Sequence, residues 1–411
     1  MRVAIFCEYF YPFISGVVTH IDTLRQGLEA EGHEVLIVTL DPKAKRHYIK
    51  DRVLYCPAIP LKKIYGYGVA NPVNLKRLKI VKAFKPDIIH FHTEFSMGIF
   101  AMFAAQRLKL PSVYTLHTMY DDYLFYIFRY GTERVARPAA HRILRNLAAR
   151  VTKIIGPSQK VEAYMRRCGV TQEINIIPNT VDLTDFMTAN VPQEDVQAVR
   201  KQLGITPDDV TFCFVGRLGK EKSIDVLIDY FAANFAKEER FKLFVIGDGP
   251  EKEQLAYQIE HLGLEKQIKL LGRIEHEDLP AYYQAFSLFA TASLTEMNSI
   301  SMLEATASGL YVLQRLDIYN RDQIVSGVNG DVFTTPAEFG DIVRGYAGKT
   351  PEERQALRKS VSAYAALYGP KEFTEKVLDV YQRAIETYKH NPKGLPKHGA
   401  DKPASHKKGK K

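Results

Sequence analysis

Short apolar runs alternate with stretches of helical periodicity along most of the chain. In the first half, runs typical of buried strands lie at Val3–Cys7, Val35–Leu40, Asp87–His92, Ser112–Leu116, Ile154-Ile155 and Ile174–Ile177. The clearest helical pattern between them is Val18–Ala30, where apolar residues recur every three or four positions before Glu31-Gly32-His33 ends the segment. Alternating units of this length predict a parallel, doubly wound α/β sheet.

The second half of the chain repeats this plan. Its predicted strands are Val210–Val215, Lys242–Ile246, Ile268–Leu271, Leu288–Ala290 and Tyr311–Gln314. Its predicted helices are Ser223–Ala236, Lys252–Leu262, Leu279–Ala285, a segment beginning near Asn298, and a helical pattern from Glu352 to about Lys389. The pattern therefore predicts two Rossmann-like units that meet near Pro178–Pro192.

The length of 411 residues also favours more than one domain. We expect an N-terminal domain at 1–180, a C-terminal domain at 193–365 and a helix at 366–389 that packs back on the first domain. The segment 390–411 has almost no large apolar residue and is expected to be a disordered basic tail. A role of this tail in solubility is as compatible with its composition as a role at a membrane.

Charge is distributed unevenly along the chain. Residues 1–180 carry 26 Lys and Arg against 14 Asp and Glu, whereas residues 181–388 carry 22 against 32. A basic first half favours an anionic partner surface, either nucleic acid or acidic membrane. The four cysteines form no CxxC pair, so we expect buried thiols and neither disulfides nor zinc. No signal peptide or membrane-spanning stretch is expected.

Candidate binding chemistry is clearest in the segment LTEMNSISMLEATASG, where seven residues separate Glu296 from Glu304. A predicted strand precedes it, and a helix beginning near Asn298 would point free backbone N–H groups at the strand end. Such a helix start can bind phosphate, and carboxylates can accept hydrogen bonds from sugar hydroxyls. Alone, the pair could also be an acidic helix start and a solvated glutamate.

Other candidate residues follow the ends of predicted strands, where ligands bind in open α/β sheets. They are Gly16, His117, Arg217, Lys222, Gly247 and Arg273. Each is weak evidence alone, because a turn glycine, a structural histidine or a solvated basic loop would look the same. Together, a basic pair, two carboxylates and a helix start on one edge fit a nucleotide-diphosphate sugar. Asp121-Asp122 is not spaced to hold Mg²⁺, so no metal site is expected.

With these residues in place, the chain resembles retaining glycosyltransferases of family four, which have the GT-B fold of two Rossmann-like domains facing a central cleft. The resemblance covers about residues 1–385. The matching segments, in order, are SGVV, YTLHT, GRLGKEKS, GDGPEKEQL, LGRI and the segment from Glu296 to Glu304. CEYFYPFISGVVTH, YTLHTMYDDY and ISMLEATASGLYV are most similar to bacterial diacylglycerol glycosyltransferases, which work at the cytoplasmic membrane face.

The resemblance implies a role for each candidate residue. Gly16 would approach the donor phosphate, and His117 would lie by the donor sugar and the reaction centre. Arg217 and Lys222 would contact the diphosphate, and the backbone near Arg273 and Ile274 would hold uracil. Glu296 would bind sugar hydroxyls and Glu304 the ribose. The implied phosphate contacts also include Gly247 and the helix start at Asn298, Ser299 and Ile300.

The implied reaction transfers glucose or galactose from UDP-glucose or UDP-galactose with retention of configuration and without a metal. The implied acceptor is diacylglycerol or a monoglycosyl-diacylglycerol, and similarity near Met297–Tyr319 favours addition of a second sugar. The sequence departs from the family at Met297-Asn298-Ser299, where the family has a glycine, and at Tyr311, where it has a proline. A transferase for a soluble or polyprenyl-linked acceptor and a catalytically silent lipid-binding partner are the alternative interpretations.

The basic first half contains two segments that suit a peripheral position on the cytoplasmic membrane face. Residues 119–153 combine aromatic and basic side chains, and Ala139–Lys153 has an apolar stripe at Ile143, Leu144, Leu147 and Val151. A second basic cluster consists of Lys76, Arg77, Lys79, Lys82 and Lys85. The stripe would look the same as the core face of an ordinary helix. No nucleic-acid recognition motif is present, so anionic lipid is the favoured surface.

Overall fold

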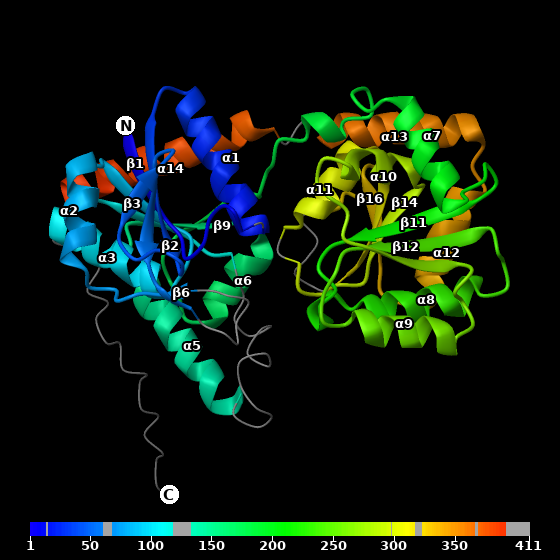
Figure 1. Cartoon of the computed structure of the whole chain (residues 1–411), viewed down its shortest axis with the longest axis horizontal. Helices are drawn as coiled ribbons and strands as arrows, with labels where there is room; N and C mark the ends of the chain where they lie inside the picture. Colours follow the sequence, from blue (N-terminus) through cyan, green and yellow to red (C-terminus); the bar gives the residue numbers. More distant parts are fainter. Residues whose placement is uncertain are drawn as a thin grey trace, which may run out of the picture.

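The structure is a computed structural model, and it describes residues 1–13, 15–60, 68–117, 133–296, 298–316, 323–365 and 369–391. These residues form two sheets that lie side by side, each covered by helices (Figure 1). The predicted Asp121-Asp122 loop, Met297 and nearly all of the predicted tail lie outside the described residues.

The first sheet has eight strands, and all neighbouring pairs except β3 with β4 are parallel. In spatial order they are β10 (Ile174–Ile176), β9 (Lys153–Gly156), β8 (Ser112–Thr115), β7 (Ile88–Phe91), β1 (Arg2–Phe6), β2 (Glu34–Asp41), β4 (Val53–Pro57) and β3 (Tyr48–Lys50). A separate short pair joins β5 (Ile59–Pro60) to β6 (Gly68–Val69). The helices are α1 (Gly16–Ala30), α2 (Leu75–Phe84), α3 (Ser96–Leu108), α5 (Glu133–Ala148) and α6 (Gln159–Arg167).

The second sheet has six strands, all parallel. Their spatial order is β13 (Ile268–Gly272), β12 (Phe241–Ile246), β11 (Val210–Val215), β14 (Leu288–Thr291), β15 (Tyr311–Arg315) and β16 (Gly330–Phe333). The helices are α7 (Gln193–Leu203), α8 (Ile224–Phe235), α9 (Lys252–His261), α10 (Leu279–Ala285), α11 (Ile300–Ala307), α12 (Pro336–Ala347) and α13 (Pro351–Ala365), with 3₁₀ turns at Thr184–Phe186 and Lys220–Lys222. The predicted doubly wound α/β fold is confirmed.

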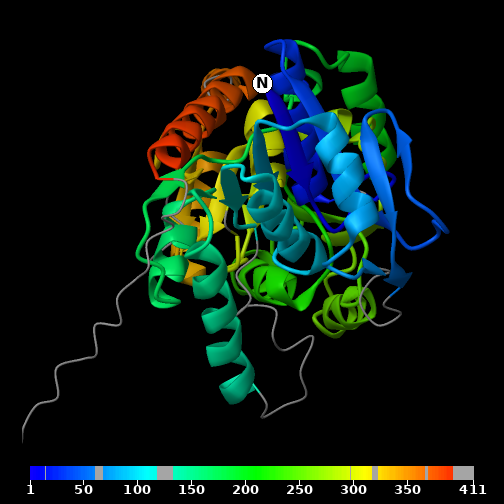
Figure 2. The ribbon, with the colours of Figure 1, turned by 90° about the vertical axis from the view of Figure 1, so that its left-hand side faces the viewer.

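The last helix, α14 (Pro370–His390), lies over the first sheet rather than the second (Figures 1 and 2). Its buried residues Phe373, Val377 and Tyr381 share a core cluster with Val3 and Ile5 of β1. Close approach to α1 needs a glycine there, because a Cβ on Gly27 would lie 2.0 Å from Thr374 Oγ1. The chain thus crosses between the halves twice, which ties the two sheets together.

Two surface predictions need correction. Leu144, Leu147 and Val151 of the predicted apolar stripe are buried in the core of the first half, and Ile143 alone of the four is exposed. Helical periodicity cannot distinguish a core face from a membrane face, and here the core accounts for most of it. Arg77 of the second basic cluster is also buried, with its guanidinium 4.6 Å from the Phe100 ring centroid, so it does not belong to the basic surface.

No helix among the described residues is long and apolar enough to cross a membrane. The four cysteines are free and buried, as predicted.

Candidate active site

The carboxyl ends of β11 and β14 bring a basic and an acidic loop together. These two strands are neighbours at the point where strand order reverses, the usual position of a ligand in an open α/β sheet. Lys222, after β11, donates to Glu296, after β14, with Nζ 2.6 Å from Oε1. Arg217 pairs with the buried carboxylate of Glu221 in the same loop. The predicted meeting of a basic pair with Glu296 at one edge is confirmed.

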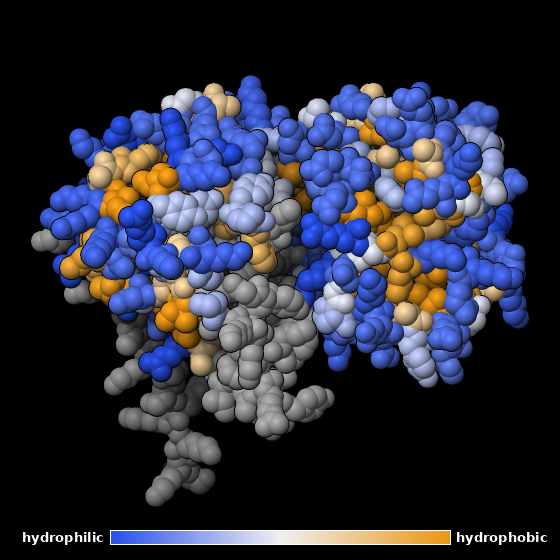
Figure 3. All heavy atoms as spheres, in the orientation of Figure 1, coloured by the Kyte–Doolittle hydropathy of each residue, from blue (hydrophilic) through white to orange (hydrophobic). Residues whose placement is uncertain are grey.

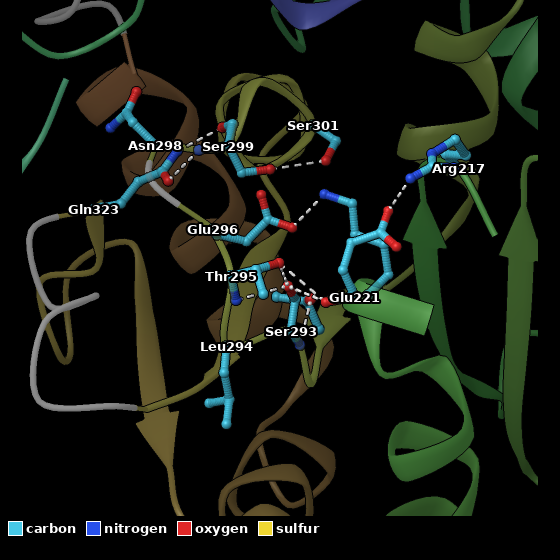
Figure 4. A network of polar contacts seen from close by, with 12 residues as sticks. Arg217, Glu221, Ser293, Leu294, Thr295, Glu296, Asn298, Ser299, Ser301 and Gln323 are labelled. Carbon is cyan, nitrogen blue, oxygen red and sulfur yellow. Dashed lines mark hydrogen bonds and ion pairs between the residues drawn. The ribbon is translucent and has the colours of Figure 1, made fainter. Parts of the chain in front are cut away.

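Small polar side chains hold the Glu296 loop against the β11 loop (Figure 4). The backbone carbonyl of Glu221 accepts hydrogen bonds from Ser293 Oγ at 3.2 Å and Thr295 Oγ1 at 3.0 Å. Burial opposes ionisation of Glu296 and by itself would raise its pKa. The pKa is nevertheless lower than the ordinary value, because Lys222 supplies a charge and a hydrogen bond, Ser293 a hydrogen bond and Lys160 a further charge. Glu296 is therefore a preformed, ionised hydrogen-bond acceptor.

The helix that follows, α11, begins one turn after Glu296. Its N-cap residue Ser299 is fixed from outside the helix, because Gln323 Oε1 accepts from Ser299 N at 2.7 Å and Gln323 Nε2 donates to Ser299 O at 2.6 Å (Figure 4). Ile300 is the first helical residue, so the amides of this turn have no partner within the helix. The predicted phosphate-binding helix start thus lies beside Lys222 and Glu296.

Glu304 lies on the second turn of α11 and is only 5% exposed. Its two carboxylate oxygens contact different residues: Oε1 lies 3.2 Å from His276 Nε2, and Oε2 accepts from Tyr283 OH at 3.0 Å. The hydrogen bond to Glu304 raises the pKa of His276 despite partial burial. Neither His276 nor Tyr283 was among the predicted site residues.

The ends of β12 and β13 continue the same edge. Gly247 is packed closely against the β11 loop, since a Cβ there would lie 1.9 Å from Gly216 O. Backbone packing therefore explains this glycine without a ligand. The Arg273 side chain is 66% exposed and pairs with Glu275 at 3.2 Å, while Ile274 packs on the core beneath. The structure thus places the predicted base-binding backbone at the edge strand, two positions from β11.

The first sheet presents histidines at its carboxyl edge. His117, after β8, is 8% exposed, and its Nε2 lies 2.8 Å from Nδ1 of buried His92, after β7. His20 of α1 packs edge-on to His117, with ring centroids 4.6 Å apart. His90 bonds to Tyr381 OH and Thr115 Oγ1, each at 2.7 Å. Burial lowers the pKa of all four imidazoles, to about 4 for His20, so they are neutral near pH 7.

His20, His92 and His117 also have the residue types of a metal site, with ring nitrogens within 4.8 Å of one another. The His92–His117 separation of 2.8 Å argues for a shared proton instead. Two nitrogens bound to one tetrahedral zinc lie roughly 3.3 Å apart, given Zn–N bonds of about 2.0–2.1 Å. As they stand, these histidines form a hydrogen-bonded cluster around His117.

Residues of the first half hold both ends of the Glu296 loop. Lys160 of α6 is buried and donates from Nζ to the backbone carbonyl of Leu294. Asn179, in the connection after β10, donates to Asn298 O at 3.0 Å. Gly16, at the start of α1, faces α11, with Ile300 Cδ1 3.6 Å from the position of a Cβ. The predicted Gly16 therefore lies opposite the predicted phosphate-binding helix start.

Two groups of site residues were not predicted from the sequence. They are the residues of the first half that contact the Glu296 loop and the histidines around His117. Lys160 and Asn179 lie 134 and 119 positions from their partners, and no local pattern marks such contacts. A signal for the histidines was available, because residues two apart in a strand share a face. His90 and His92 in the predicted strand Asp87–His92 satisfy that spacing.

Profiles of known families cover most of the chain. A profile described as Glycosyltransferase Family 4 matches residues 14–185, and one described as Glycosyl transferases group 1 matches residues 195–360. An alpha-monoglucosyldiacylglycerol synthase of Acholeplasma laidlawii is 34% identical over 345 residues, which are 82% of this chain and 86% of that protein. Its counterpart in Streptococcus pneumoniae is 31% identical, over 81% of this chain and 75% of that protein.

Solved structures share the fold at low sequence identity. The Anabaena protein HepE in complex with UDP has a TM-score of 0.73 and 19% identity, and the match covers 93% of this chain and all of that one. WaaG, a glycosyltransferase involved in lipopolysaccharide biosynthesis, has a TM-score of 0.63 and 18% identity over 92% of this chain and 99% of that one. The two-sheet arrangement is therefore a known one.

Proposed function

The chain belongs to glycosyltransferase family 4 and has the GT-B fold, and we propose that it transfers glucose or galactose from a UDP-sugar to a diacylglycerol-type lipid. As a member of this family it is a glycosyltransferase that uses a nucleotide-sugar donor. The proposed acceptor is a monoglycosyl-diacylglycerol, or diacylglycerol itself, and the product is α-linked. The names of the two synthases described above, each more than 30% identical to this chain, support this choice of acceptor.

The observation that carries the proposed donor site is the contact of Lys222 with Glu296 beside the start of α11. In the proposed complex, the α11 amides, Arg217 and Lys222 bind the diphosphate, and Gly16 closes over it from the first half. Glu296 accepts hydrogen bonds from the donor sugar, Glu304 from the ribose, and the backbone at Arg273 and Ile274 binds the uracil. Arg217 and Lys222 supply the positive charge that a metal ion supplies elsewhere.

The proposed reaction is a front-face substitution. The bond from C1 of the sugar to the UDP oxygen breaks, and the acceptor oxygen forms its bond to C1 on the same face. A phosphate oxygen of the leaving UDP takes the acceptor proton, so no protein base is required. The protein then contributes positioning and charge stabilisation. His117, neutral and held by His92, faces the reaction centre in this arrangement and can offer a hydrogen bond without adding charge.

Transfer assays test this function. We expect labelled UDP-glucose or UDP-galactose to label diacylglycerol or monoglucosyl-diacylglycerol in mixed vesicles, with the products resolved by chromatography. Label in a soluble sugar and none in lipid would favour the soluble-acceptor alternative. Lipid binding without any transfer would favour the silent partner.

The proposed working place is the inner membrane face, with the basic surface of the first half against anionic lipid. Exposed bases on α5 and just after it are Arg137, Arg142, Arg145 and Arg150, and those at α2 are Lys76, Lys79, Lys82 and Lys85. Exposed apolar side chains accompany them at Ile143 and Leu75, and Figure 3 shows apolar residues on the surface of this half. Both helices thus combine charge with small apolar contacts, as interfacial segments do.

Vesicle binding tests this placement. Each base near the surface contributes up to about 1 kcal/mol, and salt screens it. Replacing Arg142, Arg145 and Arg150 with Ser is expected to weaken binding to anionic vesicles and lipid glycosylation while UDP affinity stays. Replacing Lys237, Lys252 and Lys266, exposed bases of the second half, is the control with equal charge loss. Equal binding to neutral and anionic vesicles would contradict the proposal.

A further inference from the structure

The carboxylate of Glu304 is held in place by side chains from two elements outside its own helix. His276, after β13, and Tyr283, on α10, reach its two oxygens from different elements, at 3.2 Å and 3.0 Å. A carboxylate offers about two acceptor positions on each oxygen. Among the residues that the structure describes, these contacts use one position on each oxygen, which leaves one on each for a ligand.

An aromatic residue behind the pair fixes the direction of both donors. Phe186 is buried and lies edge-on to both rings, with centroids 5.3 Å from His276 and 5.8 Å from Tyr283. The His276 side chain is still 56% exposed, so it borders the open edge of the sheet while Glu304 lies beneath it. The carboxylate is therefore presented to the edge in one orientation.

We propose that His276 and Tyr283 are positioning residues that fix the Glu304 carboxylate to accept two neighbouring hydroxyls, and so make the donor site selective for ribonucleotides. This inference rests on the proposed function, in which Glu304 binds the ribose. A vicinal diol matches the two remaining acceptor positions, whereas a 2′-deoxyribose leaves one of them unused. A site built around a hydroxyl rejects an analogue that lacks it, because its buried polar group is then unpaired.

The raised pKa of His276 agrees with this geometry. Glu304 is its principal partner, and Glu277 and Asp185 add weaker attraction for the proton. The three acidic groups keep His276 a donor toward Glu304 over a wider range of pH than for an isolated histidine.

Calorimetric titration of the full chain with UDP and with 2′-deoxy-UDP tests the inference. The quantity measured is the ratio of the two dissociation constants, which a general loss of stability would not change selectively. We expect His276→Ala and Tyr283→Phe each to reduce this ratio by about threefold to tenfold, chiefly through weaker UDP binding, since each variant loses one hydrogen bond to a charged group. Thermal unfolding checks that Tyr283→Phe, which removes only the hydroxyl, remains folded.

His261→Ala is the matched control, because His261 is an exposed histidine of the same half and stacks on Tyr257. An unchanged ratio in both positioning variants, with Glu304→Gln abolishing the discrimination, would overturn the inference and leave the donor site intact. A wild-type protein that binds UDP and 2′-deoxy-UDP equally would overturn the ribose site itself, and the inference with it.

Discussion

The carboxyl edge of the first sheet presents neutral imidazoles, whereas that of the second sheet presents ion pairs. At the first edge, His20, His90, His92 and His117 are buried, and burial lowers the pKa of each. At the second, Lys222 pairs with Glu296 and Arg217 with Glu221. An anionic diphosphate needs fixed positive charge, whereas a neutral acceptor hydroxyl needs a dry surface with hydrogen-bonding groups. Under the proposed function, this difference favours binding of the donor at the second edge and of the acceptor at the first.

The ion pairs of the second edge also mean that the proposed diphosphate must share Lys222 with Glu296. Lys222 Nζ has three hydrogens and can donate to a carboxylate and a phosphate together. Binding of the donor would then pull Lys222 toward the phosphates and leave Glu296 with acceptor capacity for the sugar. In the proposed complex, donor binding therefore rearranges the Lys222–Glu296 ion pair.

The largest expected effect follows from replacing the acidic partner of the Lys222–Glu296 ion pair. Glu296→Gln keeps the shape but removes the charge, and we expect kcat to fall by roughly 10²–10³, the scale seen for a lost transition-state contact. UDP affinity should stay or rise, because Lys222 is released for the diphosphate. Turnover at saturating donor and calorimetry with UDP measure the two effects. Glu260→Gln, on the exposed face of α9, is the control. Near-normal turnover in folded Glu296→Gln would contradict a donor-site role.

The second-largest expected effect is that a fall in pH destabilises the first sheet more than the second. The histidines have folded-state pKa values below the unfolded value of about 6.5, so the unfolded chain takes up protons first as pH falls. Their contribution to stability is complete above pH 6.5 and falls as the pH drops below it, by roughly 2 kcal/mol at pH 5 for His20, whose pKa is about 4 in the folded chain. Glu8 offsets part of this loss, because burial raises its pKa to about 7. Glu296, whose pKa is lowered, begins to lose its contribution only below the ordinary carboxyl pKa.

Amide hydrogen exchange at pH 7 and pH 5 measures this difference region by region. Peptides from β7 and β8 should lose protection on acidification, while peptides from β14 and α11 keep theirs. His92→Gln should reduce the loss in the first half, since it removes one of the groups that titrate. Equal loss of protection in both sheets would show that the histidines do not set the acid sensitivity.

Local pattern predicted the second edge better than the first. The strand Val210–Val215 was predicted with the bounds observed. Because Arg217 and Lys222 follow this strand and Glu296 follows the predicted strand Leu288–Ala290, the sequence placed all three residues on one edge of the sheet. The Lys222–Glu296 contact follows because β11 and β14 are adjacent. The first edge depends on side chains within or beyond elements, such as His20 on a helix and His92 beneath His117, whose meeting is a tertiary property.

The surface was predicted least well. Periodicity showed that the segment Ala139–Lys153 has an apolar stripe but could not tell what covers it, and the core covers Leu144, Leu147 and Val151. Arg77 shows the converse, since its charge predicted a surface position while Met97 and Phe100 enclose it. Both errors arise because burial depends on which elements pack together, which a single helix does not reveal.

Arg217 and Lys222, the basic residues of the second edge, are expected to contribute to UDP binding as well as to turnover. Arg217→Ala and Lys222→Ala should each weaken UDP binding by roughly 1–3 kcal/mol, since each removes a charge-assisted contact. Calorimetry with UDP measures this, with Lys252→Ala, an exposed lysine of α9, as the control. Unchanged affinity in both variants would move the nucleotide away from this edge.

The smallest expected effect concerns the contact between the two edges. Lys160 reaches from α6 of the first half to Leu294 O, and its charge helps to lower the pKa of Glu296. Lys160→Met should reduce kcat by about tenfold, equivalent to about 1.4 kcal/mol, because Asn179 is then the one of the two first-half anchors that still holds the loop. UDP affinity should not change, since the proposed diphosphate contacts come from the second half and from Gly16.

The matched control for this variant is Lys153→Met, which removes a lysine of the same half that pairs with Glu173 near the surface. A fall in UDP affinity as large as the fall in kcat would mean that Lys160 contacts the donor directly rather than through the loop. Unchanged kcat and affinity would mean that the Lys160 contact is not needed to position Glu296. The split between turnover and binding therefore decides whether the first half only covers the donor edge or holds its acidic loop in place for the reaction.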